Sequence, residues 1–146
     1  MKHLLAALLL VIAVTAGAAA QMTTPTILAP SDVKWTPASG PMAGTQMAVV
    51  YGDPSKAGPY VVLFKLPDGW KAPPHTHGDD ENVTVLSGVA LFGIGDKPDP
   101  AKMKELPAGS FVSVPKGVAH YAMAKGDSII EVSGVGPSSM TVLKPK

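Results

Sequence analysis

Three histidines and one glutamate are the residues of this chain best suited to chemistry. His75 and His77 are two positions apart, and Glu81 follows four positions after His77. Residues two apart in a strand point to the same face, roughly 7 Å along it, and an extended chain would bring Glu81 to that face as well. His120 offers a third imidazole. Imidazole and carboxylate groups together suit a divalent transition metal, so these four residues are candidate ligands.

These residues and their neighbours could instead have structural roles, without binding a metal or taking part in catalysis. A single histidine is more often a packed structural residue than a ligand, but every histidine after residue 20 belongs to this set. Asp79 and Asp80 could add ligands or a base. Because Gly78-Asp79-Asp80 has the composition of a turn, we predict a solvated turn and little effect of Asp79→Ala. Tyr121 has the opposite strand parity to His120, which predicts outward packing, with a role as catalytic acid as the less favoured alternative.

Composition argues against several classes of protein. The 146-residue chain has 12 basic residues, all of them lysine, and no cysteine. Nucleic-acid binding proteins depend on arginine for bidentate contacts with phosphates and bases, so we predict no nucleic-acid partner. The lack of cysteine excludes disulfides, zinc–thiolate sites, iron–sulfur clusters and thiol nucleophiles. A hydrophobic content of 46% and a charged content of 16% are those of a chain that folds.

The first 20 residues have the pattern of a secretory signal peptide. A short polar start precedes an unbroken apolar run, residues 4–14, and small residues ending in Ala18-Ala19-Ala20. This run is shorter than the roughly 20 residues that span a bilayer as a helix, which makes an uncleaved membrane anchor the less favoured alternative. Cleavage after Ala20 leaves residues 21–146. We predict a periplasmic or secreted protein without membrane contact after cleavage.

The predicted export route bears on the identity of the metal. Folded proteins leave the cytoplasm on a twin-arginine signal, which a chain without arginine lacks. Export of the unfolded chain would mean that the site takes its metal outside the cytoplasm. The Irving–Williams order then favours copper or zinc at imidazole and carboxylate ligands, with iron, manganese and nickel as alternatives.

Residues 21–146 predict a single all-β domain that begins with a polar arm at residues 21–34. Short runs rich in β-branched and aromatic residues alternate with turn sequences such as Pro67-Asp68-Gly69, the pattern of a sandwich or barrel. A proline-rich connection from Gly95 to Leu106 has room for one helical turn at residues 96–101. Phe92, Phe111 and Met123 are predicted core residues. The predicted strands are residues 45–51, 60–66, 82–86, 89–94, 111–114, 118–123, 128–132 and 140–143, with a break at Ser87-Gly88.

Two segments resemble the paired motifs of the cupin superfamily. The first motif has intervals of five, one, three and six residues, and the second has intervals of five, one and two. The matching residues are Gly69, His75, His77, Glu81 and Gly88, then Gly109, Pro115, Gly117 and His120. One position departs from the pattern, because Ala124 stands where the second motif usually has asparagine. That asparagine is not a metal ligand, so the departure bears on the polarity around the site rather than on the metal.

The resemblance implies a fold and a ligand set. Cupins are double-stranded β-helices of the jelly-roll type. By resemblance, His75, His77, Glu81 and His120 form a shell of three imidazoles and one carboxylate around one divalent metal ion inside the barrel. Cupins often pair through edge strands, which leaves a homodimer open.

The resemblance also limits the expected activity. Cupins with this shell include dioxygenases, decarboxylases, lyases and isomerases, and four protein ligands leave one or two open positions on a five- or six-coordinate metal. We expect a small metalloenzyme of dioxygenase-like type acting on a small molecule. The lack of arginine, which would bind the carboxylate of a 2-oxo acid, argues against a reaction that depends on such a co-substrate. The alternative is a non-catalytic module that binds a metal or a small ligand, because no further histidine is available for acid–base catalysis.

Overall fold

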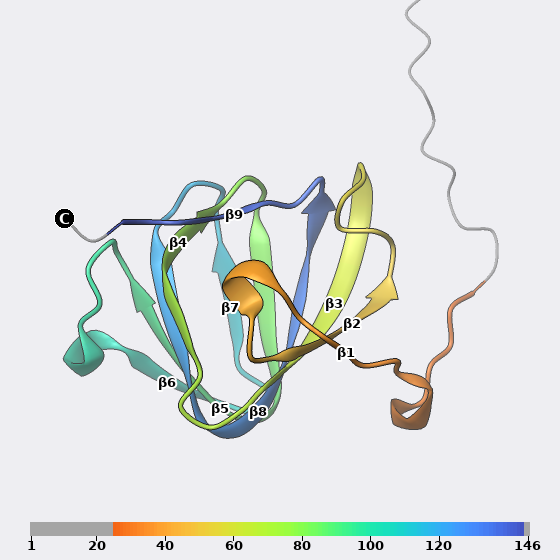
Figure 1. Ribbon diagram of the computed structural model, residues 1–146, viewed down its shortest axis with the longest axis horizontal. Coiled ribbons are helices and arrows are strands. Elements are labelled where there is room, and N and C mark those ends of the chain that lie inside the picture. Colours follow the sequence, from red (N-terminus) through yellow and green to blue (C-terminus); the bar gives the residue numbers. More distant parts are fainter. Residues whose placement is uncertain (1–24, 145–146) are drawn as a thin grey trace, which may run out of the picture.

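Antiparallel strands make up most of the computed structural model, which describes residues 25–144 (Figure 1). The strands within this range are β1 (Thr36–Pro37), β2 (Gln46–Tyr51), β3 (Gly58–Leu66), β4 (Lys71–His77), β5 (Glu81–Ile94), β6 (Lys104–Pro107), β7 (Phe111–Val114), β8 (His120–Gly136) and β9 (Met140–Val142). Three short 3-10 turns accompany them, η1 (Pro30–Asp32), η2 (Gly40–Met42) and η3 (Pro100–Lys102). The predicted signal peptide, residues 1–20, lies outside the described residues.

Two long strands, β5 and β8, hold the sheet together. They pair antiparallel from Asn82↔Ser133 to Ile94↔His120. The other edge of β5 pairs with β6 and β7, whereas β8 also pairs with β3 and β4. The continuous strand order β1-β2-β3-β8-β4-β9 therefore curls around an interior, with β9 lying beside β4 (Figure 1). The predicted all-β barrel is confirmed.

The predicted break at Ser87-Gly88 is wrong, because β5 runs through it. The register shifts on both sides of Ser87: β5 has the extra residue between Val85 and Ser87, and β8 has the extra residues between Ile129 and Lys125. Such irregularities bend a strand without ending it. Gly88 has a φ of +73°, a conformation that glycine adopts at little cost. In the same way residues 120–123 of one predicted strand and all of the predicted strand 128–132 belong to one strand, β8, which continues through Gly126 at φ +75°.

Three strands, β1, β4 and β6, are absent from the predicted strand ranges, although the spacing of His75 and His77 was interpreted as that of a strand. β6 carries two exposed charged residues, and only Leu106 of its four residues is buried, so it has no clear hydrophobic pattern. It follows η3 in the proline-rich connection, where one helical turn was expected at residues 96–101. Residues 25–34 of the polar arm lie outside the sheet, and the chain then joins it at β1, just after Trp35. The Lys65 ammonium lies 4.2 Å from the centre of the Trp35 ring.

One cluster of buried apolar residues lies on β5 and β6 and is packed by β7 and β8. Val85, Ala90 and Leu106 are buried together, and Phe92, Val112 and Ile130 pack against them. The prediction that Phe111 is a core residue is wrong, because its side chain is 61% exposed. Neighbouring residues of a strand face opposite sides, and in β7 it is Val114 that is buried.

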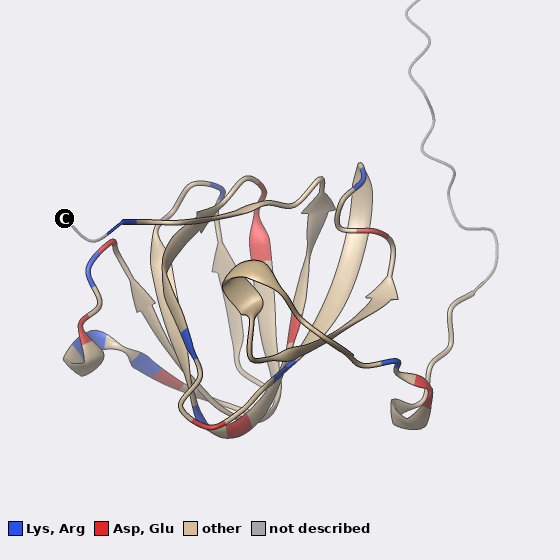
Figure 2. Cartoon of the chain, viewed as in Figure 1, with Lys and Arg blue, Asp and Glu red and all other residues tan. Residues whose placement is uncertain are grey.

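Charged residues lie mostly on loops and strand ends, with both signs interspersed (Figure 2). None of the helical segments between residues 25 and 144 is long and apolar enough to cross a bilayer.

Candidate metal centre

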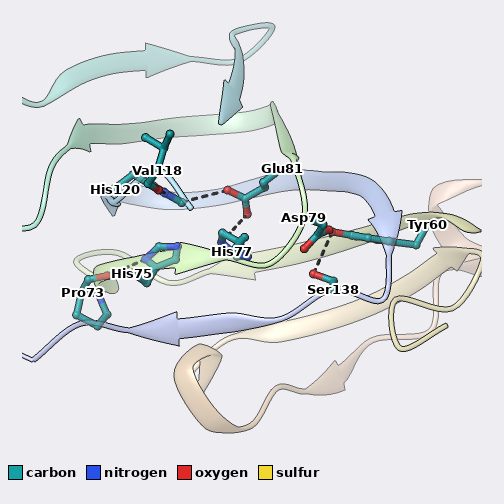
Figure 3. A network of polar contacts seen from close by, with 9 residues as sticks. All are labelled: Tyr60, Pro73, His75, His77, Asp79, Glu81, Val118, His120 and Ser138. Carbon is teal, nitrogen blue, oxygen red and sulfur yellow. Dashed lines mark hydrogen bonds and ion pairs between the residues drawn. The ribbon is translucent and has the colours of Figure 1, made fainter. Parts of the chain in front are cut away.

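The three predicted histidines meet on the inner side of the barrel wall (Figure 3). β4 carries His75 and His77, and β8 begins at His120. His75 and His120 are direct cross-strand partners, which brings together residues that are far apart in the sequence. One ring nitrogen from each of the three histidines lies within 4.8 Å of the others. Such a cluster could hold a metal ion.

Glu81 reaches this cluster by a different path from the predicted one. The chain turns after β4, and Glu81 begins the next strand, β5, so it does not lie on an extension of the same strand. Its Oε1 lies 3.4 Å from His77 Nε2, and its Oε2 lies 3.2 Å from His120 Nε2 (Figure 3). The turn packs closely on the β8–β9 loop, because a Cβ at Gly78 would collide with Ser139 Oγ.

Backbone carbonyl groups orient two of the imidazoles. His75 Nδ1 lies 2.7 Å from the carbonyl oxygen of Pro73, and His120 Nδ1 lies 3.0 Å from that of Val118. A carbonyl oxygen only accepts hydrogen bonds, so each Nδ1 is the protonated nitrogen and donates. When either ring is neutral, its Nε2 therefore keeps a lone pair. This arrangement is typical of histidines that bind metals.

The two prolines before His75 lie where β4 pairs irregularly with β8. The register of β4 against β8 shifts between Ala72 and His75, so Pro73 and Pro74 lie in an irregular stretch of the pairing. Because this stretch is irregular, the lack of amide hydrogens at the two prolines removes few hydrogen bonds between β4 and β8.

The donor atoms fit a divalent metal. Nε2 of His77 and of His120 both approach the carboxylate of Glu81, and such an assembly of lone pairs requires a proton or a metal cation between its members. Metal–ligand bonds of roughly 2.0–2.2 Å separate neighbouring ligand atoms by roughly 3 Å, close to the 3.2 Å and 3.4 Å found here. His77 Nε2 is buried and has no hydrogen-bond partner among the described residues, as expected of an atom with a ligand of another kind.

Burial and mutual charge set the pKa values of the site. Burial lowers the pKa of His75 to about 4, despite its bond to the Pro73 carbonyl. For His120, burial acts in the same direction, but the hydrogen bond to Glu81 outweighs it and raises the pKa. For Glu81, burial would raise the pKa, but the contact with His120 and the charges of the neighbouring imidazoles lower it overall. Glu81 is thus an anion near neutral pH, as a ligand must be.

The turn between β4 and β5 is held from several sides. The Tyr60 hydroxyl donates a 2.8 Å hydrogen bond to Asp79 Oδ2. Asp80 Oδ1 accepts from the Lys116 amide at 2.8 Å, and His77 O accepts from the Gly117 amide at 3.0 Å. The predicted solvated turn is therefore wrong for Asp79, which is buried, and holds for Asp80, which is exposed.

A cavity of about 350 Å³ adjoins the metal-site residues. Its walls are largely apolar and include Phe92 and Met123, which were predicted as core residues. Several other residues that line the cavity were not predicted from the sequence, namely Met42, Met47, Tyr60, Trp70 and Met140. Spacing along the chain carries no signal for them, because they come from separate strands and turns.

Comparison with known proteins places this architecture in a family. Residues 26–143 match a family described as "Domain of unknown function (DUF4437)". The chain belongs to the DUF4437 family. No match was found among curated proteins.

Solved structures similar to this DUF4437 chain include proteins described as cupins. A RmlC-like cupin from Shewanella frigidimarina is 16% identical, with a TM-score of 0.62 over 77% of this chain and 91% of the other. KdgF from Halomonas sp. is 20% identical, with a TM-score of 0.61 over 77% and 96% of the two chains. The polyketide cyclase RemF from Streptomyces resistomycificus is 20% identical, with a TM-score of 0.64 over 83% and 88%. At these identities the likeness establishes the fold, and the predicted cupin jelly roll is confirmed.

Two positions near the second motif of this DUF4437 chain lie outside the cavity lining. Ala124, the departure from the cupin pattern, is buried, and its backbone is hydrogen-bonded to Gly69 and Trp70. Tyr121 faces away from the cavity as predicted, yet it is only 4% exposed. Its hydroxyl accepts a 3.0 Å hydrogen bond from the Asp99 amide, so the connection before η3 covers it.

Proposed function

We propose that this protein is an exported, metal-dependent cupin enzyme that acts on a small, neutral, largely apolar molecule. The observation that carries the proposal is the position of the ligand set. Three imidazoles and one carboxylate line the wall of a cavity of about 350 Å³, large enough for a small organic molecule. A bound divalent metal would supply Lewis acidity there and, if redox-active, the ability to activate dioxygen.

The cavity lining supports a neutral substrate. Outside the metal site, its polar side chains are those of Ser55, Tyr60, Trp70, Ser138 and Ser139, and none of the lining residues that the structure describes is a lysine. An anionic substrate would have only the metal as a cationic partner, because the chain has no arginine. The apolar walls instead favour desolvation of an aliphatic or aromatic molecule.

A dioxygenase-like reaction fits the small number of acid–base groups. Tyr60 is the only titratable residue in the lining, as far as the chain is described, that is not a metal-ligand candidate. Burial raises its pKa to about 12, and its hydroxyl is already bonded to Asp79. A reaction with dioxygen, which a bound redox-active metal would activate, makes the least demand on such groups. The small number of acid–base groups in the cavity also favours a second candidate function, that of a non-catalytic module that binds a metal or a small ligand.

Oxygen uptake separates these candidates. The protein is loaded with copper, iron, manganese, nickel or zinc in turn and supplied with a panel of neutral aromatic and aliphatic molecules under air and under argon. Substrate-dependent oxygen uptake supports the dioxygenase, turnover under argon indicates a non-oxidative reaction, and saturable binding without turnover indicates the binding module. His77→Ala should abolish activity, and Phe111→Ala, at an exposed side chain, serves as the matched control.

Export has its own test. The signal peptide predicts that mature protein recovered outside the cytoplasm begins at Gln21. Protein that stays in the cytoplasm with its first 20 residues intact would contradict this part of the proposal.

A further inference from the structure

Thioether side chains are concentrated around the cavity. Of the five methionines between residues 25 and 144, all except Met103 line it, namely Met42, Met47, Met123 and Met140. Methionine is flexible and polarisable, so it fills irregular apolar space and can also act as a soft metal ligand. The position of each methionine relative to the site histidines decides whether it can be a metal ligand or only fills apolar space.

Only Met140 is the direct cross-strand partner of a site histidine. β9 pairs with β4 in the register His77↔Met140, so the two side chains lie on the same face of the sheet, and both line the cavity. Directly opposed residues have Cβ atoms roughly 4.5–5.5 Å apart, within reach of a side chain with three rotatable bonds. The register places Met47 opposite Phe64, and Met123 opposite Lys71 and Leu91.

His77 has a buried ring nitrogen that can bind a metal at this point. Its side chain is 11% exposed, and its Nε2 has no hydrogen-bond partner among the described residues. A metal bound to this nitrogen would lie between β4, Glu81 and the side of the site that β9 borders. The Met140 thioether can approach that position from β9, whereas Glu81 approaches it from β5.

The side of the site formed by Glu81 and the side formed by Met140 offer different kinds of metal ligand. A carboxylate is a hard ligand that favours divalent ions, imidazole is intermediate, and a thioether is soft and favours Cu(I). Because the chain has no cysteine, a thioether is the only soft ligand available to it. We propose that Met140 is an additional ligand of the metal site and that it allows the histidine cluster to bind Cu(I). This inference rests on the proposed metal site and adds a ligand and a metal state to it.

Parallel affinity measurements on one pair of variants test the proposal. Cu(I) affinity is measured without oxygen by competition with a chromophoric Cu(I) chelator, and Zn(II) affinity by competition with a zinc indicator. Met140→Leu keeps an apolar side chain of similar size. It should lower Cu(I) affinity at least about tenfold and leave Zn(II) affinity within about twofold. Met47→Leu, which alters a cavity methionine opposite Phe64, should leave both affinities unchanged.

X-ray absorption of the Cu(I)-loaded protein provides a direct readout. A sulfur neighbour of copper should be present in the wild type and in Met47→Leu, and absent in Met140→Leu. Unchanged Cu(I) affinity in Met140→Leu overturns the proposal, and so does an equal loss of Cu(I) and Zn(II), or an equal effect of Met47→Leu. A wild type that binds neither ion overturns the metal site itself, so the two failures are distinguishable.

Discussion

The Tyr60 hydroxyl is hydrogen-bonded to the Asp79 carboxylate at 2.8 Å, joining β3 to the turn that separates β4 from β5 (Figure 3). Asp79 stands in the chain between two candidate ligands, His77 and Glu81. Its other carboxylate oxygen, Oδ1, is buried and has no hydrogen-bond partner among the described residues. Ser138 Oγ, from the β8–β9 loop, lies 3.2 Å from the same hydroxyl. This contact therefore links three separate parts of the barrel next to the candidate metal centre.

Removal of the Tyr60 hydroxyl should destabilise the protein. In Tyr60→Phe the Asp79 carboxylate stays buried and loses its donor, which costs about 1–3 kcal/mol of the free energy of unfolding. Urea denaturation of the metal-free protein measures this cost. Tyr51→Phe is the matched control, because no hydrogen bond of its hydroxyl is found within residues 25–144, and it should change stability little. Equal effects of the two changes would contradict the assigned role.

Substitution of His77 and substitution of Asp79 by alanine should have different effects on metal binding. His77→Ala removes an imidazole whose Nε2 points at the cluster, and metal occupancy should fall at least about tenfold. Asp79→Ala should lower stability but keep most of the occupancy at saturating metal, because Asp79 is not among the clustered donors. Elemental analysis of both purified variants decides the matter. Loss of the metal from Asp79→Ala alone would show that the ligands are misassigned.

Acid should destabilise the metal-free protein through His75. The pKa of about 4 in the folded state lies below the ordinary 6.5, so the unfolded chain binds more protons between these values. The stability that His75 contributes is complete above pH 6.5 and is lost as the pH falls towards 4, a change of roughly 3 kcal/mol. Urea denaturation with a chelator at pH 7, 5.5 and 4 should show this decline.

Two histidine variants separate the source of this pH dependence. His75→Gln should flatten the decline between pH 6.5 and pH 4. The pKa of His120 is raised, so its contribution is present below pH 6.5 and is lost as the pH rises above that value. His120→Gln should therefore leave the acid decline in place. An unchanged profile in His75→Gln would mean that another group causes the decline.

The motif glycines should differ in their tolerance of a side chain. Gly88 and Gly109 have φ angles of +73° and +86°, so alanine costs about 1–2 kcal/mol at either position. At Gly88 the added Cβ would also collide with the Asp127 carbonyl oxygen, whereas nothing lies within 4 Å at Gly109. Gly88→Ala should therefore lose about 1–3 kcal/mol more than Gly109→Ala in urea denaturation. Equal losses would argue against the close approach of β5 and β8 at this bulge.

Features that depend on residue type and short spacing could be predicted from the sequence. These include the all-β class, most strand positions and the gathering of His75, His77 and His120 in one cluster. Such predictions succeed because a strand alternates its faces every residue and because few side chains can bind a transition metal. Phe111 was predicted wrongly as a core residue, because a large apolar residue does not by itself indicate which face of its strand is buried.

The tertiary structure decided which residues share the space around the candidate metal centre. Glu81 approaches the histidines from β5, not along β4, because the chain turns at Gly78. Tyr60 buries Asp79, and β9 places Met140 opposite His77, although each pair is far apart in the sequence. Contacts of this kind depend on how distant strands pair and on the register they adopt, and the apolar walls of the cavity arise in the same way. Local sequence patterns carry no information about such pairings, so only the folded barrel shows them.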